Sequence, residues 1–204
     1  AAASLYSDSF TGADGAAWPS AWTATSSSGS ATIQGNTGRL AYNDVSGAYA
    51  RAQLSGVAPT VDTDTTMSFQ WSANGAASYL DVYARGSGGW QNAYRPRTGY
   101  GLELTGNSAN VKVLKNINGT LTTLATVNGA QSVSTAKQWL RFRVVGSTIQ
   151  FKIWADGATE PTTWNSTITD TEITAGAACS RATPRHPPPR RRSPRRTPPR
   201  RRST

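Results

Sequence analysis

The chain has 204 residues and a formal net charge of +10, and this excess charge is confined to its C-terminal end. Ten of the 21 lysines and arginines lie in residues 179–204, so the other 178 residues carry 11 basic and 11 acidic side chains. The neutral body excludes a broad basic surface for nucleic acid. The lack of cysteine before Cys179 excludes a disulfide framework there, and no apolar run reaches the roughly 20 residues of a membrane span.

Taken in chain order, the body (residues 1–178) predicts about ten short strands and no helix. Alternating runs rich in Thr, Val, Ile, Tyr and Trp are separated by clusters of Gly, Asn and Ser. Strands are expected within residues 39–44, 49–54, 65–73, 78–86, 99–106, 110–127, 138–155 and 163–170. This pattern is typical of a two-sheet antiparallel sandwich or a barrel, an all-β fold class.

Two of these segments predict β-hairpins. Asn118-Gly119 divides the run from 110 to 127, and Gly146-Ser147 divides the run from 138 to 155. Both pairs suit a tight turn, because glycine and asparagine take a positive φ with little strain.

Residues 179–204 form a tail of arginine, proline, serine and threonine, with the single histidine of the chain. The tail has no aromatic residue, so it cannot bury enough apolar surface to offset its ordering entropy, and it is predicted to be disordered. Nucleic-acid binding through this tail is expected to be non-specific at most. Its composition is that of a GC-rich coding sequence read out of frame, which indicates a frameshifted or foreign terminus.

Several motifs in the body are similar to those of concanavalin A-like, laminin G-like jelly-roll domains. The motifs are Asp8-Ser9-Phe10, Trp22, Thr37-Gly38-Arg39-Leu40, SYLDVYARGSGGWQNAYR and LRFRVVGSTIQFKIWADGATEPTTWNSTITD. The resemblance covers Leu5 to about Gly176. It implies a two-sheet antiparallel jelly-roll sandwich that lacks its last strand, because a further strand pair is expected where the tail begins. Such domains occur in secreted bacterial multidomain proteins, carbohydrate-active enzymes and phage tail proteins.

The segment from 78 to 97 supplies the candidate carbohydrate-binding residues. Strand alternation predicts that Tyr79, Asp81, Tyr83 and Arg85 face solvent, while Leu80, Val82 and Ala84 face the core. Aromatic rings present flat apolar faces to sugars, and carboxylates and guanidinium groups bind hydroxyl pairs. Trp90 and Tyr94 are expected on a loop or its edge, flanked by Arg95 and Arg97. The predicted site is Asp81, Tyr83, Arg85, Trp90, Tyr94 and Arg97; cross-strand stabilisation of the sheet without any ligand remains the alternative.

The sequence favours a secreted, non-catalytic, monomeric module that binds a polysaccharide or cell-surface glycan. The alternative is a structural spacer or adhesion domain without a small ligand. An enzyme is the third reading, because glucanases of this superfold use an E-x-D-x-E pattern that is absent here. Only Glu103 and Asp81 are placed to meet across neighbouring strands, and both are expected to be solvated. No cofactor is expected, although the resemblance implies a structural calcium near Asp8. Four tryptophans are predicted in the core or at the sheet rim: Trp22, Trp139, Trp154 and Trp164.

Overall fold

The computed structural model describes residues 4–43, 45–58 and 60–174, and every regular element in these ranges is a β-strand. The twelve strands are β1 (Trp22–Ser27), β2 (Gly29–Gln34), β3 (Thr37–Tyr42), β4 (Tyr49–Leu54), β5 (Thr63–Phe69), β6 (Tyr79–Gln91), β7 (Arg95–Thr105), β8 (Ser108–Ile117), β9 (Thr120–Val127), β10 (Gln138–Val145), β11 (Thr148–Ala155) and β12 (Ser166–Thr169). The sequence does not predict β1 and β2, because the stretch WTATSSSGSATIQ has few apolar residues to alternate.

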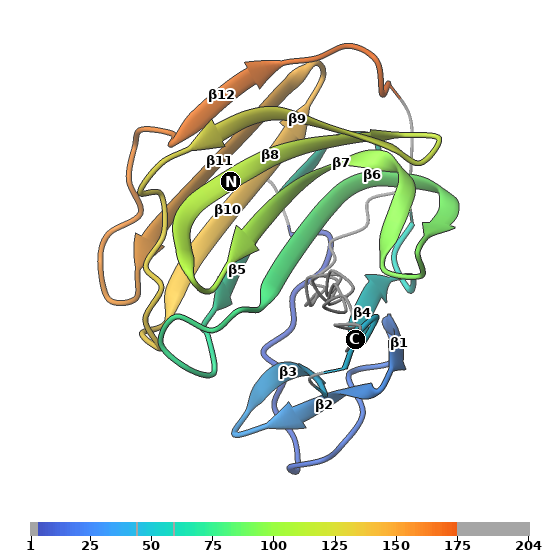
Figure 1. Ribbon diagram of the computed structural model, residues 1–204, viewed down its shortest axis with the longest axis vertical. Coiled ribbons are helices and arrows are strands. Elements are labelled where there is room, and N and C mark those ends of the chain that lie inside the picture. Colours follow the sequence, from blue (N-terminus) through green and yellow to red (C-terminus); the bar gives the residue numbers. More distant parts are fainter. Residues whose placement is uncertain (1–3, 44, 59, 175–204) are drawn as a thin grey trace, which may run out of the picture.

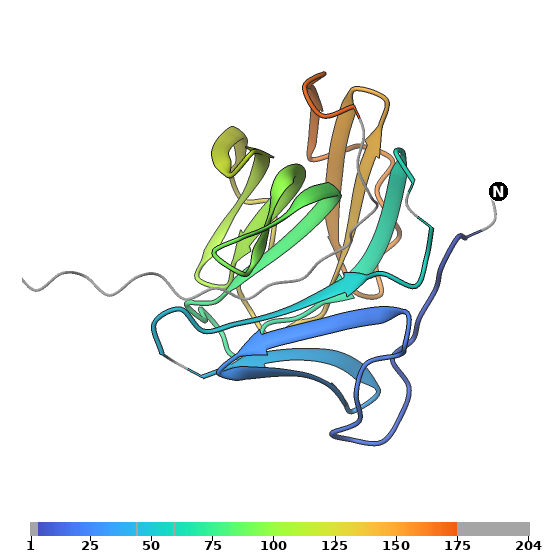
Figure 2. The same cartoon turned by 90° about the vertical axis from the view of Figure 1, so that its right-hand side faces the viewer.

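Two four-stranded antiparallel sheets form a sandwich (Figures 1 and 2). One sheet has the order β12-β11-β10-β5, and the other has the order β6-β7-β8-β9. Strands β1 to β4 form two smaller sheets, β1-β4 and β2-β3, which lie together at one end of the sandwich in both views. The predicted jelly-roll sandwich is confirmed.

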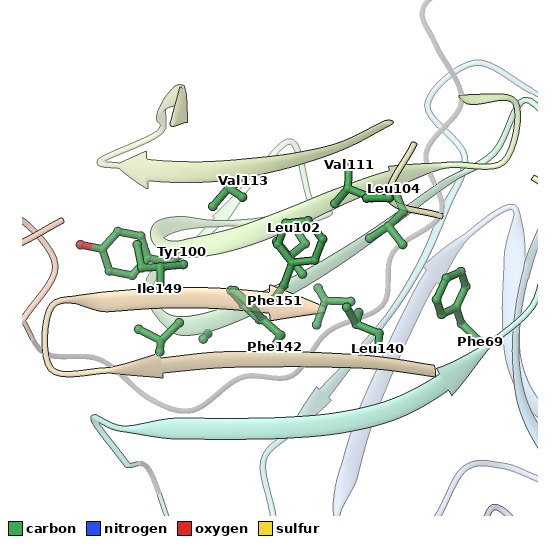
Figure 3. Close-up of a cluster of buried hydrophobic side chains, with 14 of the residues drawn as sticks. Phe69, Tyr100, Leu102, Leu104, Val111, Val113, Leu140, Phe142, Ile149 and Phe151 are labelled. Atoms are coloured by element: carbon green, nitrogen blue, oxygen red, sulfur yellow. The ribbon is translucent and has the colours of Figure 1, made fainter. Parts of the chain in front are cut away.

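The hydrophobic core lies between the two four-stranded sheets (Figure 3). Alternate residues of β7, β8, β10 and β11 contribute to it, as the two-residue period of a strand requires. From one sheet come Val82, Ala84, Tyr100, Leu102, Leu104, Val111 and Val113; from the other come Phe69, Leu140, Phe142, Val144, Ile149 and Phe151. The predicted core face of β6 is therefore confirmed, and Trp71 also belongs to this core.

Both predicted hairpin turns are present. The β8–β9 hairpin turns at Asn118 and Gly119, which have φ angles of 51° and 90°. The β10–β11 hairpin turns at Gly146, with a φ of 55°. These left-handed conformations are the reason that asparagine and glycine serve as turn signals in the sequence.

The strands at the end of the sandwich have an aromatic cluster of their own. Trp22 lies between Tyr6, Phe10 and Trp18, with ring centroids 5.5 to 6.0 Å away. Phe10 and Trp18 meet edge to face at 4.7 Å. This packing agrees with the structural role that the sequence predicts for Trp22.

The predicted tail (residues 179–204), its boundary at residue 178 and the expected missing strand all lie outside the described residues. The described residues contain no helix of the length and apolarity that would cross a bilayer.

Candidate functional site

The hairpin formed by β6 and β7 is bent near its tip (Figure 1). The register between the two strands shifts twice, between Ala84 and Ser87 and again between Ser87 and Trp90. Gly88 and Gly89, which lie in the second irregular stretch, both have a φ of 75°. β-bulges and left-handed glycines increase the local twist and bend of a strand, so the sequence GSGG allows this hairpin to curl.

The curled tip lies over the face of the β6–β9 sheet opposite the core. Arg95 and Glu103 are eight residues apart on β7, which would separate them by roughly 26 Å on a straight strand. Their side chains nevertheless approach to 3.7 Å, between Nη2 of Arg95 and Oε2 of Glu103. The same nitrogen lies 3.6 Å from Oδ2 of Asp81 on β6. The tip therefore folds back toward the middle of the sheet.

We call this region the hairpin site. It comprises side chains on the non-core face of the sheet, Asp81, Tyr83, Glu103 and Lys112, and residues of the hairpin tip, Trp90, Tyr94, Arg95 and Arg97. The tip is also fastened to the β8–β9 turn, because Gln91 donates to the carbonyl of Gly119 and Asn116 donates to the carbonyl of Pro96.

The two carboxylates of the site face each other across β6 and β7. Asp81 is the register partner of Glu103, so the predicted meeting of these residues is confirmed. Their predicted solvation is wrong: Asp81 is 0% exposed and Glu103 is 5% exposed. The curled tip is the reason, because it brings the Arg95 guanidinium, itself 4% exposed, over both acids. Lys112 of β8 completes the group with a 2.8 Å bond to Oε1 of Glu103.

Tyr83 is also buried, at 1% exposure, where the sequence predicts a solvent-facing ring. Its register partner is Gly101, and a β-carbon built on Gly101 would lie 2.4 Å from Cε1 of the tyrosine ring. The ring therefore lies against the glycine backbone in a space that any side chain at 101 would fill. Strand alternation cannot show that the face of Asp81 and Tyr83 is buried. Side chains alternate every two residues whether the polar face of a sheet is exposed to solvent or covered by another segment.

The prediction that Arg85 shares the face of Asp81 and Tyr83 is wrong. Arg85 has a φ of 53° and stands at the first bulge of β6, where the alternation of side chains is interrupted. Its side chain, 2% exposed, turns toward the opposite sheet. There the guanidinium donates to three carbonyls and one carboxylate, which belong to Val61, Gly146, Ile173 and Asp62. Arg85 thus closes one edge of the sandwich.

The remaining predicted residues are at the hairpin tip. Trp90 is the partner of Pro96 near the end of β6, and Tyr94 lies in the turn, so both are at the loop edge where the sequence places them. Arg97 is exposed and donates to the carbonyl of Asn118 at 3.2 Å. Tyr94 is linked to Asp81 through the Arg95 guanidinium, whereas Arg97 contacts the β8–β9 turn and Arg85 contacts the opposite sheet.

The predicted site omits two arginines that contact its aromatic residues, although the sequence places Arg95 beside Tyr94. Cζ of Arg51, from β4, lies 3.7 Å from the centre of the Trp90 ring, and Cζ of Arg95 lies 5.3 Å from that of Tyr94. Burial lowers the pKa of the Arg51 guanidinium. The run GSGG is the one local signal that the hairpin could bend; nothing local indicates that β4 reaches Trp90.

Three of the four structural tryptophans lie on the outer face of the other sheet. Trp139 and Trp154 are cross-strand partners whose rings stack at 6.3 Å, and Trp164 lies 4.6 Å from Nζ of Lys152. They are half-buried, and Nε1 of Trp139 donates to Asp156 at 2.7 Å. Their placement agrees with aromatic residues that stabilise a sheet surface.

The described residues near Asp8 do not form a calcium site. The Asp8 carboxylate already accepts hydrogen bonds from the Tyr6 hydroxyl at 2.5 Å and the Phe10 amide at 2.7 Å. Within residues 4–43, 45–58 and 60–174, no group of three or more His, Cys, Asp or Glu side chains is placed to hold a metal ion.

Comparison with known proteins relates the chain to others by structure only. No model of a known protein family matches the sequence, and no curated protein is a detectable relative. Among solved structures, the carbohydrate-binding module CBM66 from Bacillus subtilis superposes with a TM-score of 0.55 at 17% identity, over 81% of this chain and 92% of the module.

Two lectins are similar to the same extent. The exoplasmic/lumenal domain of VIP36, bound to Ca²⁺ and Man3GlcNAc, has a TM-score of 0.57 at 13% identity, over 82% of this chain and 79% of that domain. The seed lectin of Lotus tetragonolobus has a TM-score of 0.51 at 14% identity, over 81% and 85% of the two chains. These similarities define a class: the chain has the concanavalin A-like jelly-roll fold.

Proposed function

We propose that this chain is a secreted, non-catalytic module that binds a polysaccharide or cell-surface glycan at the hairpin site. One observation carries the proposal: the curled tip holds the Arg95 guanidinium over two carboxylates, with Cζ of Arg95 5.3 Å from the centre of the Tyr94 ring. Rings such as Trp90 and Tyr94 offer apolar faces to the C–H groups of a sugar. The charged groups beside them offer both acceptors and donors to its hydroxyls.

The similar structures support a glycan ligand and an extracytoplasmic location. One is a carbohydrate-binding module, and another is an exoplasmic/lumenal domain bound to a mannose-containing sugar. Because these structures are at most 17% identical to this chain, they establish its fold only. The proposed binding role rests on the residues of the chain itself. The binding residues that we propose are Asp81, Tyr83, Trp90, Tyr94, Arg97, Arg95 and Glu103. Arg85 is omitted because its guanidinium is taken up by backbone carbonyls.

A glycan-cleaving enzyme is the second candidate, because Asp81 and Glu103 oppose each other on neighbouring strands. Glycosidases use such a carboxyl pair, but one member is a general acid held protonated in apolar surroundings. Glu103 instead bonds the Lys112 ammonium and lies beside Arg95. This surrounding of cations favours a binding role for the pair.

A glycan array followed by affinity measurements tests the proposal. The full chain should bind at least one glycan, and Trp90→Ala and Tyr94→Ala should each weaken that binding about tenfold or more, because a stacking surface is removed. Trp154→Ala, on the outer face of the other sheet, is the matched control and should bind as the unchanged chain does. Binding to no glycan would favour a spacer, and release of shortened sugars would show an enzyme.

A further inference from the structure

The Arg95 guanidinium is buried over the two acids without hydrogen-bonding to either. Its Nη2 lies 3.6 Å from Asp81 and 3.7 Å from Glu103, beyond the usual N–H···O range of about 2.7–3.2 Å. Among the described residues, Nε and Nη2 of Arg95 have no hydrogen-bond acceptor. A buried N–H donor of a charged group costs free energy when it has no acceptor. A polar ligand atom beside the Arg95 guanidinium would supply the missing acceptor.

The charges in contact around the two acids balance, while Arg51 and Arg97 contact Trp90 and the Asn118 carbonyl. Asp81 and Glu103 contribute two negative charges, and Arg95 and Lys112 contribute two positive ones. A ligand with its own carboxylate or sulfate would bring a third negative charge next to two buried acids, where the low dielectric strengthens repulsion. A hydroxyl carries no net charge, donates to a carboxylate and at the same time accepts from a guanidinium.

We propose that the hairpin site recognises a neutral, hydroxyl-rich glycan, and that Arg95 determines this specificity by holding a sugar hydroxyl between itself and the two carboxylates. This inference rests on the function proposed above and adds the class of ligand to it. It also assigns a role to Asn116, whose amide Nδ2 donates to the Pro96 carbonyl and so holds the backbone next to Arg95 in place.

Access to the acids requires the tip to lift from the sheet. Asp81 and Glu103 are at most 5% exposed, and the tip that covers them is joined to the first part of β6 through the two left-handed glycines, Gly88 and Gly89. A sugar that enters therefore replaces the weak, long contacts of Arg95 with hydrogen bonds of normal length. The bound state gains charge-assisted hydrogen bonds that the free protein does not make.

The test compares neutral and acidic polysaccharides with the full chain. Neutral mannan, xylan, glucan and fructan oligosaccharides are set against polygalacturonate and alginate, at about 0.15 M and about 0.5 M salt. The higher salt is needed because the ten tail arginines attract any polyanion, and such contacts between exposed charges are screened at high ionic strength. We expect a neutral glycan to remain bound at both concentrations and acidic glycans to dissociate at the higher one.

Three variants separate the role of Arg95 from folding and from the tail. Arg95→Gln should weaken neutral-glycan binding by about 10- to 100-fold, the loss of charge-assisted hydrogen bonds. Arg95→Lys keeps the cation over the buried acids, and so the fold, but loses the planar fork; it should weaken binding about tenfold. Arg143→Gln, an arginine on the opposite sheet, should change nothing.

Each outcome decides a different claim. If no glycan binds at the higher salt, the proposed function itself fails. If an acidic glycan binds there and Arg95→Lys weakens it, the function holds and the neutral class is wrong. If a neutral glycan binds equally well to the unchanged chain and to a folded Arg95→Lys variant, Arg95 does not determine specificity.

Discussion

At the scale of single residues, Tyr83 and Gly101 form a pair in which the absence of one side chain makes room for the other. The ring lies where the β-carbon of residue 101 would be, 2.4 Å from Cε1. Gly101 does not have a left-handed φ, so the glycine is required by the ring and not by the backbone. Because the Tyr83 ring is buried, and does not face solvent as strand alternation predicts, its removal should destabilise the fold.

We expect Gly101→Ala and Tyr83→Ala each to destabilise the fold, and the two changes to compensate each other. The first forces a methyl group into the ring, at a cost of about 1–3 kcal/mol, and the second removes a buried ring, at a cost of about 3 kcal/mol. In the double variant the methyl group has no ring to meet. Urea denaturation of the four proteins should show a total loss smaller than the sum, by about 1 kcal/mol or more. Strict additivity would show that the ring does not lie on Gly101.

Arg85 is expected to matter for stability and not directly for sugar binding. Arg85→Met removes the donor for the carbonyls of Val61, Gly146 and Ile173, which should lower the free energy of unfolding by about 3 kcal/mol or more. Arg39→Met, at an exposed arginine of β3, should stay within about 0.5 kcal/mol. Chemical denaturation measures both. Equal stability of the two variants would mean that Arg85 is solvated after all.

At the scale of elements, the curl of the β6–β7 hairpin determines which residues form the site. A straight hairpin would carry Arg95 far from Glu103 and would leave the acids on an open sheet face. The curl depends on a backbone conformation that glycine adopts readily and other residues do not.

The variant Gly88→Ala/Gly89→Ala should therefore reduce glycan affinity. Each alanine costs about 1 kcal/mol at a φ of 75°, and the tip relieves this strain by straightening. The matched control is Gly129→Ala/Gly157→Ala, because these glycines have φ angles of 66° and 81° in turns with open space around them. Denaturation should show a similar loss of unfolding free energy in both double variants. Calorimetry should detect weaker glycan binding only in the Gly88→Ala/Gly89→Ala variant. If the two double variants bound the glycan with equal affinity, the curl of the hairpin would not contribute to binding.

At the scale of the whole molecule, one tyrosine connects the two sheets. Tyr100 of β7 donates its hydroxyl hydrogen to Oδ1 of Asp170, which follows β12 of the other sheet, at 2.6 Å. The same hydroxyl oxygen accepts from the Ile173 amide at 3.1 Å. Lys115 of β8 bonds Asp170 at 2.6 Å and also bonds Glu172, so the segment after β12 is held by two strands of the opposite sheet.

This connection predicts a loss of stability in alkaline solution. Burial, together with the hydrogen bond to Asp170, raises the pKa of Tyr100 to about 12, whereas an unfolded tyrosine has a pKa of about 10. A raised pKa means that the stabilising effect is complete below about pH 10 and is lost as the pH rises toward 12. The tyrosinate absorbance should contain a late-titrating component that disappears in Tyr100→Phe. The unfolding free energy of Tyr100→Phe should fall less between these pH values than that of the unchanged chain.

Local signals in the sequence predict most strands and turns, and non-local contacts explain the errors. Asn118-Gly119 and Gly146 indicate their hairpins because the turn geometry depends on those residues alone. Strand alternation predicts the core face of β6 correctly as far as Ala84 and fails at Arg85. The β-bulge there inserts an extra residue, which the two-residue period of a regular strand does not predict. The role of Arg95 could not be predicted, because it depends on a bend that brings together residues distant along the strand.

The residues of the hairpin site between Asp81 and Lys112 come from one unbroken stretch of chain, β6 to β8. The buried core lies on the other side of the same strands, and the tip extends beyond it. Insertions or deletions in the tip would thus alter how far it reaches over the acids without changing a single core contact. Selection, or a protein engineer, can therefore vary the length and composition of the tip, and with it the proposed ligand preference, while the sandwich stays the same.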